Sequence, residues 1–309
     1  MINRVLIRLK VLQIVYAYYQ KGDFDAYGAE KELLRSLQKL YDLYHYLLLL
    51  VTVLTDLTQK KEDTQKQKYL PYGAIGDGHS RFINNRFAEQ LHKNKVLQHF
   101  ANKKGYLWDD DDQVFLRNLL LKILQSAVYQ EYITSPDTYE SDRNFWRHVF
   151  EKVLLDDNED MDDVLEGKCI FWSDDWTIVL TFVLKTIKRF DENSPATLPL
   201  LPMFAKEEDE DFAFQLLHFA CADKQASDAL IAKHSKNWDI GRVSTLDMCV
   251  MQMALAEIRN FPAIPINVSL NEYVELVHYY STPKSSPFIN GILDAIATEL
   301  RGDGTLFKS

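Results

Sequence analysis

Residues 286–300, SPFINGILDAIATEL, carry the clearest fold signal in this sequence of 309 residues. Ser286 suits the cap position before a helix, and Pro287 suits the first helical position, where the missing backbone N–H costs nothing. Apolar residues then recur at three- and four-residue spacing, at Ile289, Ile292, Leu293, Ile296 and Leu300. This pattern predicts an amphipathic helix with one buried face.

A second helix is predicted immediately before it. Residues Ser269–Glu272 read SLNE, the sequence of a capping box, in which Ser269 accepts from an early backbone amide and Glu272 reaches back. Val268 and Tyr273 occupy the two hydrophobic staple positions around that cap. We therefore expect a helix that begins at Ser269 and a short loop, residues 281–285, between the two helices.

Helical periodicity extends over most of the remaining chain, and no sustained two-residue alternation bounded by hairpin turns accompanies it. The 11 glycines are few for a nucleotide-binding fold with phosphate loops. We therefore expect an all-α fold. The further predicted helices are Ala29–Leu57, Gln113–Ile133, Phe145–Leu155, Asp174–Phe190, Phe212–Ala222 and Ile240–Ile258.

The formal net charge of −10 is unevenly distributed. Residues 1–108 hold 17 basic against 10 acidic side chains, residues 109–211 hold 10 against 25, and residues 212–309 hold 8 against 10. The overall charge excludes a protein that coats nucleic acid indiscriminately, but the N-terminal third is basic. The acidic runs are typical of solvated linkers or helix starts, and none has the glycine of a calcium loop.

Several classes of function are disfavoured by missing motifs. The sequence has no G-x-G-x-x-G, Walker, H-E-x-x-H or G-x-S-x-G motif, and its eight histidines show no metal-ligand spacing. The longest uncharged apolar run, Leu43–Thr55, is too short to span a bilayer, and three dispersed cysteines suit a reducing compartment. We expect a cytoplasmic protein that is not an enzyme and has no metal, cofactor or membrane partner.

The N-terminal helix is a candidate phosphate-binding element. Residues 1–22 contain Arg4, Arg8, Lys10 and Lys21 and no acidic residue. At 100° per residue, Arg4 and Arg8 fall together at the edge of a predicted buried stripe, where they are expected to face solvent without a carboxylate partner. An unneutralised arginine pair suits phosphate recognition. The stripe consists of Ile2, Val5, Leu9, Leu12 and Tyr16.

The loop near the C-terminus is a second candidate. It brings together aromatic, basic and hydroxyl side chains, which can stack on bases and contact phosphates of one RNA strand. The alternative is a helix hairpin whose aromatic side chains pack into the core, and the residues alone favour that alternative. The side chains concerned are Tyr280, Lys284, Ser285, Ser286 and Phe288.

Four motifs occur in a fixed order. Near the N-terminus, Arg8 precedes Leu12–Tyr16, LQIVY. The second motif is Asn237-Trp238-Asp239, followed by Arg242, Asp247, Ala254 and Glu257. The third is Pro265, with Leu270-Asn271-Glu272 and Val274-Glu275-Leu276, and the fourth is Ser285 with Phe288–Asp294, FINGILD. Together they resemble the NusB family of transcription antitermination factors.

The resemblance implies a non-enzymatic, all-helical RNA-binding factor built from two helical-bundle subdomains. Family members pair with the small-subunit ribosomal protein that acts as NusE and bind boxA RNA in nascent transcripts. With further Nus factors, they make RNA polymerase resistant to termination during ribosomal RNA synthesis. Matching positions place RNA contacts at Arg4, Arg8, Tyr280, Lys284, Ser285 and Phe288, and NusE contacts near Tyr16 and Asp247; Lys10 is added to the RNA set for its charge.

The resemblance covers residues 1–57 and about 207–301. We therefore expect N-terminal NusB-like helices at 1–57, an acidic helical insertion at 58–206 and a C-terminal NusB-like subdomain at 207–309. The chain departs from the family in a sparser arginine cluster, in Lys284 at a position that is often acidic, and in Gln252 in place of a common arginine. A lysine at position 284 should favour RNA.

Two other functions compete with this interpretation. A helical scaffold could bind a basic partner through the acidic centre, without distinguishing boxA from scrambled RNA. A ribosomal RNA methyltransferase with a NusB-like module would need a cofactor loop and catalytic cysteines after the module. The methyltransferase is disfavoured because the sequence ends at Ser309, directly after the FINGILD helix, whereas the scaffold remains the alternative function.

Overall fold

The computed structural model describes residues 1–22, 25–67, 77–104, 108–235 and 243–302. Within these ranges the chain is helical nearly throughout and forms no β-strand. Among the described residues, the one β-type contact is an isolated bridge between Ile2 and Phe204, next to a hydrogen bond of 2.8 Å from the Ala205 amide to the Ile2 carbonyl. The predicted all-α fold is confirmed.

The chain divides into two compact units. Unit 1 consists of Met1 and Gln38–Met203, and unit 2 consists of Ile2–Leu37 and Phe204–Ser309. Helix α2, Ala26–Gln67, contributes its first twelve residues to unit 2 and the rest to unit 1. These boundaries differ from residues 57/58 and 206/207, and the three-part division with a central insertion stays a prediction.

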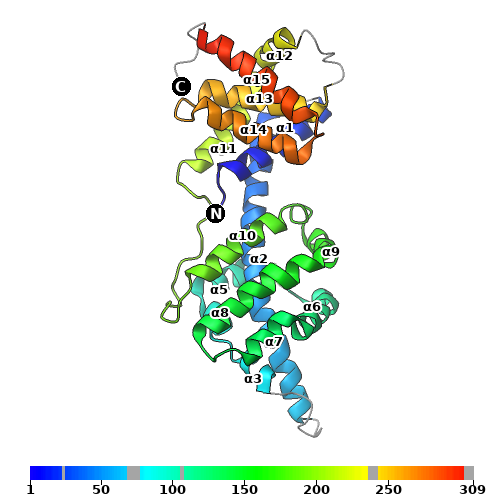
Figure 1. Cartoon of the computed structure of the whole chain (residues 1–309), viewed down its shortest axis with the longest axis vertical. Helices are drawn as coiled ribbons and strands as arrows, with labels where there is room; N and C mark the ends of the chain where they lie inside the picture. Colours follow the sequence, from blue (N-terminus) through cyan, green and yellow to red (C-terminus); the bar gives the residue numbers. More distant parts are fainter. Residues whose placement is uncertain (23–24, 68–76, 105–107, 236–242, 303–309) are drawn as a thin grey trace. The chain divides into compact units, whose positions relative to one another are not determined.

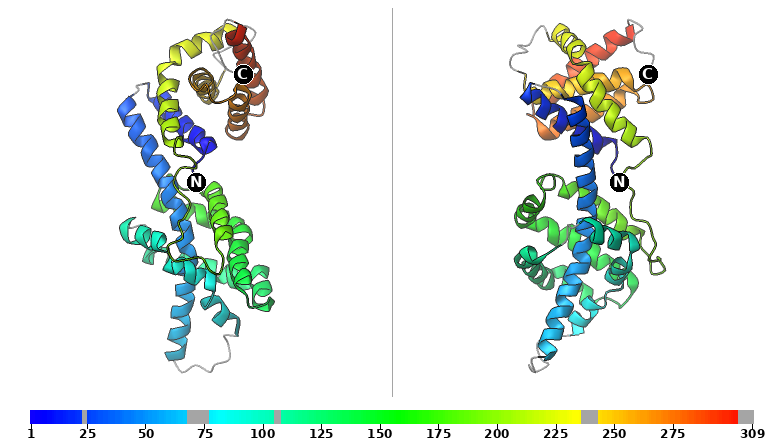
Figure 2. Two further views of the ribbon diagram at one scale, coloured as in Figure 1. Left: turned by 90° about the vertical axis from the view of Figure 1, so that its left-hand side faces the viewer. Right: turned by 180° about the vertical axis from the view of Figure 1, so that it is seen from behind.

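Unit 2 is built around one buried helix, α13, which packs against α1, α11, α12, α14 and α15 (Figures 1 and 2). Its side chains from Cys249 to Ile258 are buried without interruption, so α13 forms the centre of the core. The helices of unit 2 after α2 are α11 (Asp209–Ala222), α12 (Lys224–His234), α13 (Thr245–Asn260), α14 (Ile266–Tyr280) and α15 (Ser285–Gly302).

Helix α1, Arg4–Lys21, has well-defined ends. The Asn3 side chain accepts from the Leu6 amide at the start. Gly22 closes the helix in the left-handed region, at φ 72°, and donates its N–H to the carbonyls of Tyr18 and Tyr19. The predicted stripe is partly wrong, because Val5 is 44% exposed and the helix is buried on all sides between Leu6 and Leu12.

The capping box predicted at Ser269 is wrong. Helix α14 begins one turn earlier, at Ile266 after Pro265, so Ser269 lies inside the helix. Its hydroxyl donates to the Glu257 carboxylate at 2.7 Å, and Glu272 accepts from Arg8. The two side chains that look like a cap in sequence are therefore used for tertiary contacts.

Unit 1 contains the remaining helices, which surround the unit-1 part of α2 in Figure 1. The helix predicted from Gln113 to Ile133 is two helices, because Ser126 ends the first and caps the second by accepting from the Tyr129 amide. The elements are α3 (Asp77–Ile83), α4 (Arg86–Lys93), α5 (Lys95–Lys104), α6 (Gln113–Gln125), α7 (Ala127–Thr134), α8 (Tyr139–His148), a π-helical segment (Val149–Leu154), α9 (Asn158–Lys168) and α10 (Trp176–Arg189), with single 3₁₀ turns at Asp110–Asp112 and Leu155–Asp157.

The core of unit 1 is rich in aromatic side chains. Tyr46 of α2 stacks on Trp108 at a ring-centroid distance of 4.2 Å and also contacts Trp172. Both indole N–H groups are satisfied within the unit, since Trp108 donates to the Tyr46 carbonyl and Trp172 to the Lys39 carbonyl. α2 therefore anchors this core through both side chains and backbone.

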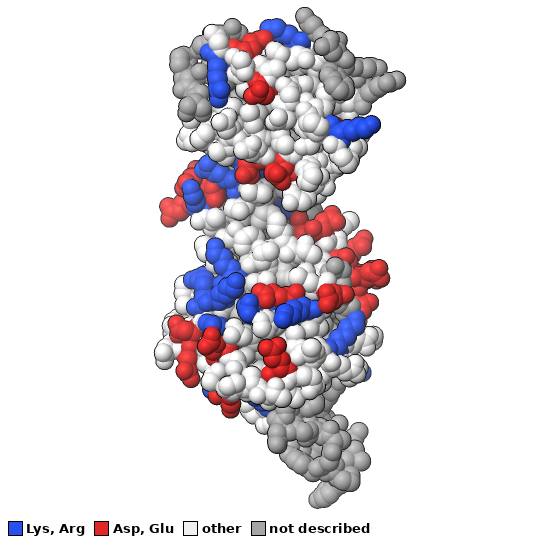
Figure 3. Space-filling view, in the orientation of Figure 1, with Lys and Arg blue, Asp and Glu red and all other residues white. Residues whose placement is uncertain are grey.

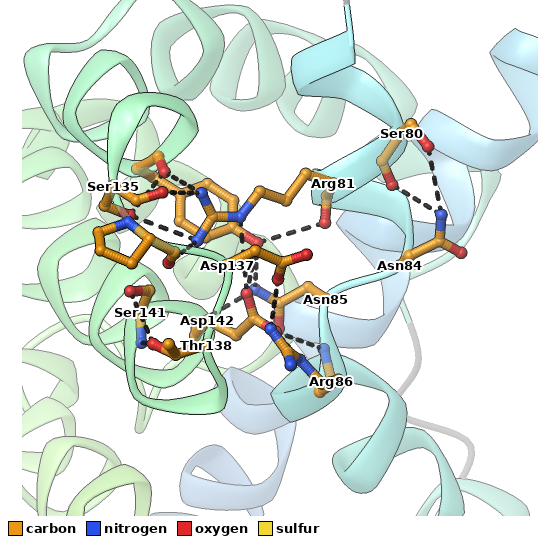
Figure 4. A network of polar contacts seen from close by, with 12 residues as sticks. Ser80, Arg81, Asn84, Asn85, Arg86, Ser135, Asp137, Thr138, Ser141 and Asp142 are labelled. Atoms are coloured by element: carbon orange, nitrogen blue, oxygen red, sulfur yellow. Dashed lines mark hydrogen bonds and ion pairs between the residues drawn. The ribbon is translucent and has the colours of Figure 1, made fainter.

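A polar network ties α3 and α4 to the segment between α7 and α8 (Figure 4). The Arg81 guanidinium donates to the carbonyls of Tyr132, Ser135 and Pro136 at 2.6–2.8 Å, which satisfies acceptors at the end of α7. Asp142 of α8 accepts from Arg86 at 2.6 Å. These contacts hold α3 and α4 against α7 and α8 through protein groups alone.

Helix α2 is long and apolar enough to meet the composition test for a membrane span over Ala26–Lys60. The most apolar window, however, is 72% buried inside the protein. This is the burial expected of a core helix.

Candidate nucleic-acid interface

Arg8 lies in the core of unit 2. Its guanidinium is 3% exposed and binds Glu257 through two hydrogen bonds of 2.8 Å, from Nε and Nη2. Nη1 donates to Glu272 at 3.1 Å. Glu257 is fully buried on α13 and also accepts from Ser269 and from the Tyr273 hydroxyl, at 3.0 Å. Arg8 therefore joins α1 to α13 and α14.

The electrostatics of this cluster favour a fixed ion pair. Burial lowers the pKa of Arg8, but the hydrogen bonds and the charge of Glu257 outweigh it, so the pKa lies above its ordinary value. Burial and the Glu257 charge raise the pKa of the Tyr273 hydroxyl well above its usual range. The prediction that Arg8 faces solvent without a carboxylate partner is wrong, because its partners lie on helices distant in sequence.

Arg4 is partly exposed and is also neutralised. Its Nε donates to the buried Asp209 carboxylate at 3.1 Å, and its guanidinium lies 4.8 Å from the Phe212 ring centroid. It borders a hollow of about 380 Å³ that is lined mainly by apolar atoms, among them those of Val5 and Val268. A guanidinium beside an apolar hollow can contact a phosphate while a base occupies the hollow.

Lys10 is buried and donates to the Gln13 side chain at 3.0 Å. Its place in the RNA set, which rests on charge alone, stays a prediction, although the side chain is covered in this structure. The physical reason is that α1 lies between other helices of unit 2, so positions that face solvent in an isolated amphipathic helix are covered here.

The loop between α14 and α15 is organised by one buried carboxylate. Asp247, in the first turn of α13, accepts from the hydroxyls of Ser281 at 2.7 Å and Ser285 at 2.8 Å. The Ser285 hydroxyl also lies 2.9 Å from that of Thr282. Ser285 is therefore buried and holds the loop, and its expected contact with RNA stays a prediction.

The outer surface of the same loop carries the expected aromatic and basic side chains. Tyr280 is 51% exposed, Tyr279 is more exposed still, and Lys284 is exposed. Within the described part of the chain, Lys284 has no ion-pair partner. Phe288 is half-buried. Aromatic faces beside a lysine are the combination that single-stranded RNA uses for stacking and phosphate contact.

The two candidate elements, α1 and the loop between α14 and α15, are held at different points of α13. Arg8 is bound at Glu257, whereas the loop is bound at Asp247 of the same helix. Ten residues of helix separate these points by about 15 Å. α1 and the loop are thus anchored at two separate, buried points of α13.

The two predicted partner-binding residues lie toward one end of the α1–α13 pair. Tyr18 and Gln252 line one hollow, of about 340 Å³, so the C-terminal half of α1 lies near the first half of α13. Tyr16 is 37% exposed and accepts from Gln20, so it is available to a partner. Asp247 is 5% exposed and accepts from the loop hydroxyls, and its expected contact with a partner stays a prediction.

Several residues that define this site have no local signal in the sequence. Asp209, Glu257 and Glu272 neutralise the arginines of α1 from more than 200 positions away. Asp228 likewise fixes Gln252, which donates to it at 2.6 Å and stands where the family often has an arginine. Of these residues, only Glu257 and Glu272 could be noticed in the sequence, because they belong to the NusB-like motifs.

Comparisons with known proteins identify the relationship. The transcription antitermination protein NusB of Salinibacter ruber (strain DSM 13855 / M31) is 34% identical over 133 residues, which cover 83% of that protein and 41% of this chain. The protein of the same name from Listeria innocua serovar 6a is 38% identical over 116 residues, 91% of its length and 38% of this chain. This chain belongs to the NusB family.

A sequence model of the NusB family matches residues 185–298. The NusB of Chloroherpeton thalassium is 41% identical over 100 residues, which cover 32% of this chain and 47% of that protein. A crystal form of T. maritima NusB aligns with 39% of this chain and 75% of its own at 28% identity and a TM-score of 0.29. The motif residues Asn237–Asp239 and Arg242 lie outside the described residues.

Proposed function

We propose that this NusB-family chain is a transcription antitermination factor that binds boxA-type RNA together with the ribosomal protein that acts as NusE. The observation that carries the proposal is the loop surface of Tyr280 and Lys284, exposed on a loop that Asp247 holds in place. A rigid loop lowers the entropy cost of ordering an RNA contact. The names of the relatives support the general function.

The proposed RNA surface in unit 2 differs from the set predicted from sequence. Tyr280, Lys284 and Phe288 are proposed as stacking and phosphate contacts, and Arg4 as a contact at the rim of the hollow. Arg8, Lys10 and Ser285 are proposed to act indirectly, because all three are buried. Arg8 and Ser285 hold the helices and the loop that present the surface.

NusE is proposed to dock near Tyr16, with other Nus factors and RNA polymerase reached through the assembled complex. A ribosomal protein is expected to be basic, and this chain has a net charge of −10, which supports attraction between the two. We propose that the factor acts in the cytoplasm without catalysis, cofactor or metal, and that boxA recognition during ribosomal RNA transcription is its role.

Fluorescence anisotropy tests this function directly. The full chain is titrated into labelled boxA RNA and into a scrambled RNA of equal length, each with and without NusE of the same organism. We expect preference for boxA that increases when NusE is added. Equal affinity for the two RNAs under both conditions would instead favour a helical scaffold whose acidic central region binds a basic partner.

A matched pair of variants locates the contact. Lys284→Glu should weaken boxA binding, because it replaces a phosphate partner by a like charge. Lys233→Glu makes the same change at an exposed position of α12, where Lys233 pairs with Glu299. The loop assignment is wrong when both variants bind boxA equally.

A further inference from the structure

The end of α10 in unit 1 carries an exposed basic face. Lys185, Lys188 and Arg189 are spaced i, i+3 and i+4, which places them on one side of the helix. All three are exposed, whereas Val183 and Ile187 on the other side are buried in the unit. Within the described ranges none of the three basic residues forms an ion pair, although the chain has 45 acidic residues to 35 basic ones.

Helix electrostatics alone account for only part of this face. Cations in the last turn stabilise a helix by about 0.3–1 kcal/mol, which suits Lys188 and Arg189. The positive charge continues, however, onto α8, where Arg143 donates from Nη1 to the Phe190 carbonyl at 2.8 Å, next to the end of α10. The basic face, defined as Lys185, Lys188, Arg189 and Arg143, thus draws on two helices.

The largest acidic cluster of unit 1 lies on another helix. Glu159, Asp160, Asp162, Asp163 and Glu166 lie on α9, and Figure 3 shows red atoms along that edge of the unit and blue atoms where α10 ends. Asp191 and Glu192 follow α10, and their charges act on Tyr139, with Glu192 also acting on Arg86. Unit 1 is therefore electrically polarised despite its acidic composition.

We infer that the basic face is a sequence-independent site for the phosphate backbone of single-stranded RNA. Charge complementarity selects a polyanion. Among the described residues, neither α8 nor α10 exposes a large apolar side chain, so the face lacks the anchors on which protein–protein interfaces depend. Lysine and arginine heads on a rigid helix suffice for phosphate contacts, which need no base recognition. The inference rests on the proposed function, which brings nascent RNA to the protein.

The test compares two triple variants of the full chain. The first, Lys185→Gln with Lys188→Gln and Arg189→Gln, removes the free cations of the face. The control, Lys93→Gln with Lys122→Gln and Arg117→Gln, removes the same residue types from exposed positions on α4 and α6. Each is titrated into boxA RNA and scrambled RNA of about 30 nucleotides at salt concentrations from 50 to 200 mM, after circular dichroism has confirmed equal helix content.

We expect the first variant to bind both RNAs more weakly by the same factor, so that the ratio of boxA to scrambled affinity is unchanged. Three lost phosphate contacts should make the slope of log K against log salt shallower by about 2. Between 50 and 200 mM salt, the RNA affinity of the variant should therefore fall by a factor about 18 times smaller than that of the wild-type chain. Equal slopes for the first variant and the control would overturn the inference. Equal affinity of the wild-type chain for boxA RNA and scrambled RNA would instead refute the proposed function.

Discussion

The buried carboxylate of Glu257 should control the stability of unit 2. Glu257→Gln removes the charge that faces the 3%-exposed Arg8 guanidinium and leaves Glu272, at 3.1 Å, as its remaining carboxylate partner. Glu257 also accepts from Ser269 and Tyr273. A glutamine offers one oxygen to these donors and turns an N–H₂ group toward the others, so at least two hydrogen bonds are lost.

Removing one partner of a buried ion pair costs about 3–5 kcal/mol. At 1.36 kcal/mol per factor of ten, this corresponds to amide exchange in α13 and α14 that is roughly one hundred to several thousand times faster. Hydrogen-exchange mass spectrometry measures this change directly. Peptides of α8 serve as an internal reference, because that helix lies in unit 1 and makes none of these contacts.

A compensated variant separates structural from RNA-binding roles. Arg8→Met with Glu257→Leu and Tyr273→Phe replaces the buried ion pair by apolar side chains, a change that is often neutral or stabilising. We expect it to recover most of the lost protection and to bind boxA RNA within twofold of the wild-type chain. Less than a tenfold effect of Glu257→Gln, or no recovery in the compensated variant, would refute this account of Arg8.

Three further predictions concern other parts of the chain. Tyr280→Ala should weaken boxA binding by about 1–3 kcal/mol through lost stacking, measured by anisotropy; an unchanged Kd would remove Tyr280 from the RNA surface. Arg81→Met should destabilise unit 1 by about 3 kcal/mol, because three backbone carbonyls lose a charged hydrogen-bond donor. Urea unfolding followed by tryptophan fluorescence measures this change, since four tryptophans are buried in that unit: Trp108, Trp146, Trp172 and Trp176. Burial raises the pKa of the Cys221 and Cys249 thiols to about 12, so little thiolate is present at pH 8. Both thiols should react slowly with iodoacetamide until urea unfolds the protein, the buried Cys249 more slowly than the half-buried Cys221; rapid native labelling of Cys249 would contradict its burial.

The helical architecture was predictable because it is encoded locally. Apolar spacing predicted α10 closely, since burial on one face requires that repeat; for α13 it predicted a start at Ile240, whereas the helix begins at Thr245. The predicted start of α14 was wrong because two side chains that could cap a helix make tertiary contacts instead. Ser269 and Glu272 have the spacing of a cap, yet both point into contacts with α13 and α1, and the helix begins a turn earlier.

The candidate site, too, was only partly predictable from the sequence. The sequence pointed to Tyr280 and Lys284 only through their match to the family's motif positions, because the residues alone favour a hairpin whose aromatic side chains pack into the core. The structure shows both side chains exposed. The sequence by itself determined that α1 carries arginines without acids of its own. Only the tertiary structure decided what those arginines do, since their carboxylates come from Asp209, Glu257 and Glu272, and no local pattern specifies contacts across more than 200 residues.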